Sequence, residues 1–191
     1  MSKQKKSGPA IFMYCVIAFA AVISAASFIL YYSGLFTHGA MLWVGITAFT
    51  IMYHLWMRII MGNVTKLFKI RHSQAWFKER FFEKRLYKLL RVRQWKEHVL
   101  TYDPSAFSQE KHTLEEIANA MSKAETDHWI NELISLTTLL FAIPWGYLWI
   151  FLVTAIAAMI FDAQFIVVQR FNRPTVLRVM KKKQLRAESI Q

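Results

Sequence analysis

A carboxylate and an imidazole stand three positions apart at Glu125 and His128, in a segment expected to be helical. Residues i and i+3 share a helix face, so this carboxylate can fix the tautomer of the imidazole and raise its basicity. The pair would be half of a catalytic dyad for acid–base chemistry. The alternative is a helix entrance without chemistry, in which Glu125 favours the positive end of the helix dipole and His128 with Trp129 anchors the membrane interface.

The same Glu-x-x-His spacing occurs in di-iron helix bundles, which use two copies of it together with two further glutamates. This sequence contains one copy. We therefore expect no metal site and no resident cofactor.

Polar residues also close two of the apolar runs. His54 and Arg58 stand four positions apart at the end of one run, and Gln169-Arg170-Phe171-Asn172-Arg173-Pro174 follows another. Ionisable residues at membrane depth are costly, which makes them candidates for function. If the helix ends converge, they bring a base, amides and guanidinium groups to one depth, as an acid–base and anion-binding site requires.

Structural alternatives exist for the residues inside these runs. His54 and Arg58 could bind a lipid phosphate or line the site, but we favour snorkelling of Arg58 to the lipid headgroups. Asp162 lies deeper in an apolar run and is expected to bond to a neighbouring helix rather than to relay protons.

The composition indicates which elements position these residues. The chain has 191 residues, of which 55% are hydrophobic, and the apolar residues are concentrated in long runs on either side of a charged segment. This pattern excludes an ordinary globular enzyme, a disordered chain and a disulfide scaffold, and it indicates a membrane protein. Cys15 is the one cysteine, so an intramolecular disulfide is impossible.

Four apolar stretches are long enough to cross a bilayer core of about 30 Å, which takes roughly 20 helical residues. They cover residues 10–32, 39–61, 124–143 and 147–169, and Pro144-Trp145-Gly146 separates the last two. We predict an all-α integral membrane protein with four transmembrane helices. Residues 1–191 would form a single membrane domain.

The distribution of positive charge predicts the orientation. All 24 Lys and Arg residues lie outside the two loops at 33–38 and 144–146. By the positive-inside rule, both termini, the segment 62–122 and the basic tail 170–191 are cytoplasmic in a multi-pass protein of the cell membrane. The net charge of +12 is then explained by anionic lipid, and no nucleic-acid partner is expected.

The cytoplasmic segment is expected to be an amphipathic helical insertion between spans two and three. A helix from Trp76 to Leu90 would carry its apolar side chains on one face and lie in the headgroup plane, either as a surface helix or as one wall of a substrate groove. The apolar residues are Phe77, Phe81, Phe82, Leu86, Leu89 and Leu90. Thr113 and Glu116 are spaced as a capping box, which predicts the start of a second helix there.

Three stretches together resemble a known family. They are Leu86-Tyr87-Lys88-Leu89-Leu90-Arg91-Val92-Arg93-Gln94-Trp95-Lys96, Lys123-Ala124-Glu125-Thr126-Asp127-His128-Trp129 and Gln169-Arg170-Phe171-Asn172-Arg173-Pro174. In order and approximate spacing they are similar to the glycosyl-4,4'-diaponeurosporenoate acyltransferases of the staphyloxanthin carotenoid pathway, a family of small membrane proteins. The resemblance covers about residues 76–180 and not the first two spans. Phe171 replaces the family's tyrosine, and residues 99–103 replace an expected Leu-Pro-Asp-Gly run.

The resemblance implies an O-acyltransferase that moves a fatty acyl chain to a hydroxyl of a lipid-linked sugar or glycolipid. Acyl-CoA or another activated carrier would be the co-substrate, and membrane lipids would surround the site. The implied roles are His128 as general base, Glu125 as its orienting partner and Asn172 or Gln169 as oxyanion donor. The implied substrate and anion contacts are Arg93, Trp95, Lys96, Trp129, Arg170 and Arg173.

Three alternatives remain at this point, and one of them is an enzyme of the same fold with a different acyl donor or a phosphate-bearing acceptor. A non-catalytic four-span protein would bind anionic lipid or a partner protein through its basic surface. A transporter would place polar groups near the bilayer midplane, whereas here they gather at one face, so we rank it last. The acceptor, the acyl chain and the oligomeric state do not follow from the sequence.

Overall fold

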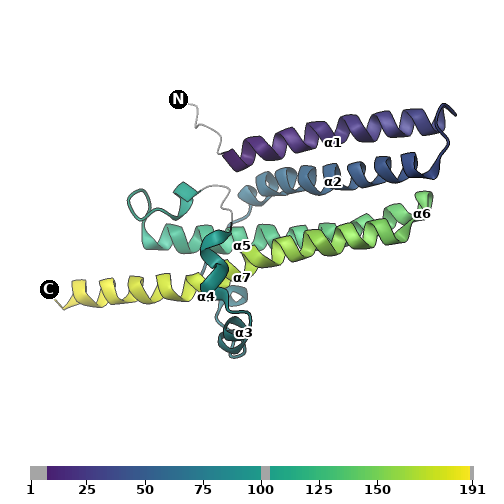
Figure 1. Cartoon of the computed structure of the whole chain (residues 1–191). Helices are drawn as coiled ribbons and strands as arrows, with labels where there is room; N and C mark the ends of the chain where they lie inside the picture. Colours follow the sequence, from purple (N-terminus) through teal and green to yellow (C-terminus); the bar gives the residue numbers. More distant parts are fainter. Residues whose placement is uncertain (1–7, 100–103, 190–191) are drawn as a thin grey trace, which may run out of the picture. The chain divides into compact units, whose positions relative to one another are not determined.

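The computed structural model describes residues 8–99 and 104–189, and all regular secondary structure in this part of the chain is helical (Figure 1). The α-helices are α1 (Gly8–Tyr32), α2 (Gly39–Val64), α3 (Glu83–Leu89), α4 (Val92–Trp95), α5 (Leu114–Thr137), α6 (Ala142–Trp145) and α7 (Leu148–Glu188). Short 3₁₀ helices cover Thr65–Leu67, Ala75–Phe77, Lys96–His98, Pro104–Phe107 and Thr138–Phe141. The predicted all-α class is therefore confirmed for the described residues.

Three of the described helices are long and apolar enough to cross a membrane. The candidate spans are Ile11–Tyr32, Gly39–Leu67 and Leu148–Glu188. They correspond to the predicted spans 10–32, 39–61 and 147–169, although α7 continues through Pro174 to Glu188. The predicted span 124–143 is not among the three, because charged side chains occupy much of α5. Four spans therefore stay a prediction.

The chain divides into two compact units. The first contains the described residues of Met1–Asn63 together with Ile130–Asp162, and the second contains Val64–Trp129 with the described residues of Ala163–Gln191. The polar residues selected from the sequence are distributed over both units. His54, Arg58 and Asp162 belong to the first, and the three stretches that resemble the acyltransferase family belong to the second.

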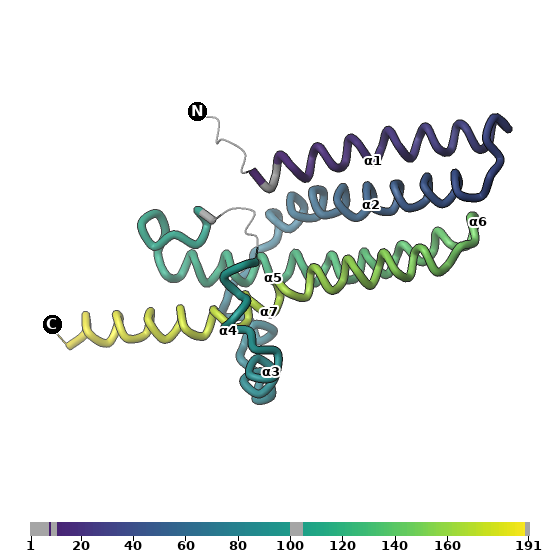
Figure 2. Tube along the Cα trace, viewed as in Figure 1, coloured from purple at the N-terminus to yellow at the C-terminus, as the bar shows by residue number. Residues whose placement is uncertain are grey.

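In the first unit, α1 and α2 run antiparallel, side by side (Figure 2). Ser24 Oγ on α1 donates a hydrogen bond of 3.2 Å to the carbonyl of Gly45 on α2. A Cβ atom at Gly45 would lie 2.9 Å from the Phe28 ring, so this approach requires a residue without a side chain. A small residue at the contact lets two apolar helices pack closely without a hydrophobic driving force between them.

The break between α6 and α7 lies where the sequence predicted it. Gly146 has a φ angle of +71° and Tyr147 one of +49°, both in the left-handed region. The Gly146 N–H donates a 2.8 Å hydrogen bond to the carbonyl of Ala142, which satisfies a carbonyl at the end of α6. Glycine adopts this conformation without the steric cost of a Cβ atom, and the chain then starts α7 at Leu148.

In the second unit, the predicted single helix from Trp76 to Leu90 is wrong. Residues Ala75–Phe77 form a 3₁₀ turn, Lys78 is extended, and the α-helix begins at Glu83. Phe77 is 6% exposed whereas Phe81 is 96% exposed, so the apolar residues do not share one face. The Phe77 ring packs 5.0 Å from the Arg173 guanidinium, and this tertiary contact outweighs the local periodicity.

The capping box at the start of α5 is confirmed. The Glu116 N–H donates to Thr113 Oγ1 at 3.2 Å, and the Thr113 N–H donates to Glu116 Oε2 at 2.8 Å. The Thr113 N–H and hydroxyl both donate to the Glu116 carboxylate, and these two hydrogen bonds favour its charged form and lower the pKa of Glu116. The box sets the start of α5 at Leu114, and this helix then carries Glu125 and His128.

Candidate functional site

Two helices of the second unit present buried polar stripes. On α5, Ala118, Ser122 and Glu125 are fully buried and recur at a spacing of four and three residues. On α7, Arg170 and Arg173 are three residues apart and are also buried. Such spacing places each set along one helix face, so charged side chains here face protein rather than solvent.

Glu125 is the counter-ion of both arginines. Its Oε1 accepts a hydrogen bond of 2.5 Å from Arg170 Nη1, and its Oε2 lies 2.7 Å from Arg173 Nη1. Contacts between a carboxylate and guanidinium groups are charge-assisted and short. Glu125 was predicted to orient His128, and its pairing with two arginines was not predicted.

Arg170 has a second carboxylate partner in Glu83 at the start of α3. Arg170 Nε and Nη2 donate to Glu83 Oε1 at 2.9 and 2.5 Å. Arg170 also donates to the carbonyls of Trp76 and Lys78 at 3.3 and 3.2 Å. One guanidinium thus joins α7 to α5, to α3 and to the extended segment before α3.

Glu83, Glu125, Arg170 and Arg173 form a cluster with formal charges that cancel, which we name the buried ion-pair cluster. Arg173 completes it by donating to Ser122 Oγ at 3.3 Å and to the carbonyl of Phe77 at 3.1 Å. Buried charges are tolerated when they are paired and hydrogen-bonded in this way.

Tyr87 on α3 extends this cluster with a neutral hydrogen bond. Its hydroxyl donates to Glu83 Oε2 at 2.9 Å. Burial, and then the adjacent Glu83 carboxylate, raise the pKa of Tyr87 above its ordinary value. The phenol therefore remains a protonated donor at neutral pH.

His128 lies one helical turn after Glu125 and is half-buried. Its ring stacks on Phe165 of α7, with centroids 4.4 Å apart and an interplanar angle of 5°. Phe165, Gln169 and Asn172 are spaced by four and three residues, so they occupy one face of α7. The imidazole thus packs against the helix face that carries both predicted oxyanion donors.

The first of the three resembling stretches also reaches α7. Lys96 Nζ donates to Asn172 Oδ1 at 3.1 Å and lies 5.2 Å from the Phe171 ring centroid. Trp95 Nε1 donates to the carbonyl of Leu90 at 2.8 Å, and this bond fixes the turn that positions Lys96. Arg93 is exposed.

Trp129 lies at the edge of the second stretch and is partly exposed. Its ring meets the Trp76 ring at a centroid distance of 6.1 Å, nearly perpendicular to it. The contacts of Lys96 and Glu125 place the first and the second stretch against the third in the second unit. Gln169 is half-buried on the same α7 segment.

In the first unit, the prediction that Arg58 snorkels to the headgroups is wrong. Arg58 forms an ion pair with Asp162, and its side chain is 14% exposed. Asn131 Nδ2 donates to the other oxygen of Asp162 at 3.3 Å, so the prediction that Asp162 bonds to neighbouring helices is confirmed. His54 Nδ1 lies 3.4 Å from Ser135 Oγ. Two opposite charges in apolar runs pair with each other because no water compensates them there.

We expect Arg58→Ala to lower the free energy of unfolding by about 1–3 kcal/mol, because it removes the guanidinium that pairs with the Asp162 carboxylate. Denaturant titration of the purified protein in detergent measures this loss. Adding Asp162→Asn should recover part of it by removing the unpaired charge. Lys69→Ala, at an exposed position, is the control, and an equal loss in both variants would contradict the ion-pair argument.

Over the described residues, no group of three or more His, Cys, Asp or Glu side chains is arranged to hold a metal ion. The groups at the site that can take part in chemistry include the imidazole, the amides and the cationic side chains. Glu83 and Tyr87 were not selected from the sequence. Within an apparently amphipathic helix, Glu83 looked like one of several solvent-exposed charges, and no local signal marked it as buried.

Over the described residues, the fold and the site define a class: an all-helical protein with three helices apolar enough to span a membrane, and a buried cluster of ion pairs beside an imidazole. A family model described as CrtO, glycosyl-4,4'-diaponeurosporenoate acyltransferase, matches residues 73–182, more than half of the chain. The protein belongs to this family and is an acyltransferase.

The match confirms the resemblance seen in the sequence. Searches of the curated proteins and of the solved structures each gave no significant match. The matched residues include every member of the buried ion-pair cluster, whereas α1 and α2 lie outside the match.

Proposed function

We propose that the protein is a membrane-embedded O-acyltransferase that moves a fatty acyl chain from an activated carrier, such as acyl-CoA, to a sugar hydroxyl of a glycosyl carotenoid or a related glycolipid. The observation that carries this proposal is the family match over residues 73–182, which covers the elements that fold around the buried ion-pair cluster. The family's named substrate supplies the acceptor class.

The reaction needs a base for the acceptor hydroxyl, and His128 is the proposed base. The hydroxyl oxygen attacks the thioester carbonyl carbon while the imidazole takes its proton. The tetrahedral intermediate then loses the carrier thiolate, which the imidazolium can protonate. Stacking on Phe165 supports this role, because it fixes the ring plane while the ring stays half-buried.

Asn172 is the proposed donor to the developing oxyanion, with Gln169 as the second candidate. Lys96 donates to Oδ1 of Asn172, which leaves the Nδ2 amide to donate to a substrate oxygen. Among the described residues, Nδ2 of Asn172 has no hydrogen-bond partner in the protein. A donor held in place before the reaction stabilises negative charge without reorganisation.

We assign a positioning role to Glu125. It holds Arg170 and Arg173 one turn before His128, and thereby fixes the spacing of α5 and α7 around the imidazole. Arg93 and Lys96 are the proposed contacts for anionic groups of substrate, and Trp95 and Trp129 are proposed to contact its apolar part.

The proposed membrane placement has four spans, with residues 124–143 as the additional crossing. The loops at 33–38 and 144–146 contain no Lys or Arg, whereas most of the basic residues lie in the second unit. The positive-inside rule then places both termini in the cytoplasm. The acyl chain of the donor would lie among the apolar helices of the cytoplasmic leaflet.

The test is mass spectrometry of lipids from cells that make a glycosyl carotenoid, with and without this chain, after feeding an isotope-labelled fatty acid. We expect the glycosyl carotenoid to gain the mass of one labelled acyl group only when the chain is present. An unmodified acceptor in cells whose membranes contain the protein would overturn the proposed function.

A further inference from the structure

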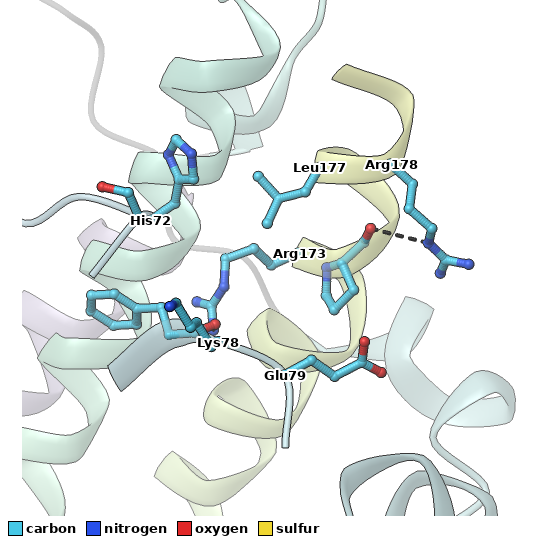
Figure 3. A pocket seen from close by; sticks show the side chains of 9 residues that line it. His72, Lys78, Glu79, Arg173, Leu177 and Arg178 are labelled. Carbon is cyan, nitrogen blue, oxygen red and sulfur yellow. Dashed lines mark hydrogen bonds between the residues drawn. The ribbon is translucent and has the colours of Figure 1, made fainter. Parts of the chain in front are cut away.

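A pocket of about 430 Å³ lies beside Arg173 and is not used by the proposed acid–base chemistry. Its lining comes from the segment before α3 and from the part of α7 that follows the buried ion-pair cluster (Figure 3). The residues that matter here are His72, Phe77, Lys78, Arg173, Leu177 and Arg178. This volume falls in the range of roughly 300–1,000 Å³ that small-molecule sites occupy.

The charge of the lining is not balanced. Lys78 is exposed, and in the described part of the chain its ammonium group has no ion-pair or hydrogen-bond partner. Arg178 donates only to the carbonyl of Pro174 and to Thr175 Oγ1, at 3.2 and 3.3 Å. The one carboxylate of the lining, Glu79, lies 3.9 Å from Lys84. Lys78 and Arg178 therefore line the pocket, and neither forms an ion pair with a carboxylate in the described part of the chain.

These cations stand at separate positions on the rim. In Figure 3, Arg173 lies beside Lys78, and the guanidinium of Arg178 extends away from both. Guanidinium and ammonium groups bind phosphate through charge-assisted hydrogen bonds. Two separated cations fit a ligand with more than one phosphate group better than a single small anion.

The rest of the lining is apolar or neutral. Phe77, Pro174 and Leu177 provide apolar walls. The backbone N–H of His72 donates a hydrogen bond to Asn119 Oδ1, so Oδ1 acts as an acceptor. His72 Nδ1 also lies 2.9 Å from Asn119 Oδ1, and it must therefore carry the proton of this second hydrogen bond. In the tautomer with its proton on Nδ1, the Nε2 atom of His72 is a hydrogen-bond acceptor.

We propose that this pocket binds the phosphate groups of the acyl donor, with Lys78 and Arg178 as the ionic contacts and the Phe77–Leu177 wall against its apolar linker. The ligand class is a phosphate-rich thioester carrier of the coenzyme A type. This inference rests on the proposed function, because it names the donor that the acyl transfer requires. Lys78 and Arg178 were not selected from the sequence, and they add to the anion contacts proposed for Arg93 and Lys96.

The test measures binding of unacylated coenzyme A to the full chain in lipid nanodiscs, by isothermal titration calorimetry. We expect the double variant Lys78→Gln/Arg178→Gln to raise the Kd at least tenfold. The matched control, Lys181→Gln/Lys182→Gln, removes the same charge from exposed positions of α7 outside the pocket and should leave the Kd within twofold. Substitution of Lys78 keeps the backbone carbonyl that accepts from Arg170, so the fold is preserved.

Two further probes identify the ligand chemistry. Pantetheine, which lacks phosphate, should bind at least tenfold more weakly than coenzyme A to the wild-type chain. Vesicles of phosphatidylglycerol should not displace coenzyme A. Equal Kd values for the two double variants, equal binding of pantetheine, or displacement by the anionic lipid would each overturn the proposal, the last by identifying a headgroup site.

Binding and acyl transfer can fail separately. Labelled glycosyl carotenoid formed by the wild-type chain, together with equal coenzyme A affinities for both double variants, would overturn the pocket assignment and leave the proposed function standing. The opposite outcome is a tenfold loss of coenzyme A affinity in Lys78→Gln/Arg178→Gln, with no acylated glycolipid in any cell. It would support the pocket assignment and overturn the proposed acceptor.

Discussion

His128→Ala is expected to lower the rate of acyl transfer by about 100- to 10,000-fold, the usual contribution of a general base. The imidazole stacks on Phe165, on the α7 face that also carries Gln169 and Asn172. Removing it leaves the acceptor hydroxyl with water as its base, while the amide donors remain. The rate is measured with purified protein in nanodiscs, from incorporation of a labelled acyl chain into a glycosyl carotenoid.

Two controls separate chemistry from folding in this experiment. His112→Ala changes an exposed histidine near the start of α5 and should keep more than half of the rate. The unfolding transition of His128→Ala should lie close to that of the wild-type chain, since a half-buried ring contributes limited packing. A folded His128→Ala protein with near-normal rate would remove His128 from the mechanism.

Arg170→Ala is expected to lower the free energy of unfolding by about 3–5 kcal/mol, as removal of one partner from a buried ion pair does. Glu83 would lose its guanidinium partner, and Glu125 would keep only Arg173. The carbonyls of Trp76 and Lys78 would also lose a donor. Denaturant titration in detergent, followed by circular dichroism, measures the loss.

A matched substitution on the same helix tests whether the effect comes from the cluster. Arg186→Ala removes an exposed guanidinium of α7 and should change the free energy of unfolding by less than about 0.5 kcal/mol. Adding Glu83→Gln to Arg170→Ala should recover stability, because it removes the unpaired buried charge. Equal losses in Arg170→Ala and Arg186→Ala would show that the cluster does not stabilise the fold.

Features that depend on neighbouring residues followed from the sequence. The long apolar helices, the break at Gly146 and the Thr113–Glu116 capping box are each encoded within one run of the chain. Short-range hydrogen bonds and hydropathy decide them, and both can be evaluated residue by residue. The family resemblance was also readable, since its motifs are short stretches of the matched region.

The sequence did not predict which residues pair with the buried charged side chains. Arg170 pairs with Glu125 and Glu83, which are 45 and 87 positions away, and Arg58 pairs with Asp162 at a separation of 104. Spacing shows that a charge is unusual at a position, but not which opposite charge compensates it.

The sequence by itself determined the helical class, the long apolar helices and the acyltransferase family. Only the tertiary structure decided that Glu125 serves two arginines, that Phe77 is buried while Phe81 is exposed, and that a cationic pocket lies beyond the cluster. The physical reason is that a buried charge needs a partner of opposite charge or a hydrogen-bonding group. Which group becomes the partner depends on which side chains the packed helices bring within hydrogen-bond distance.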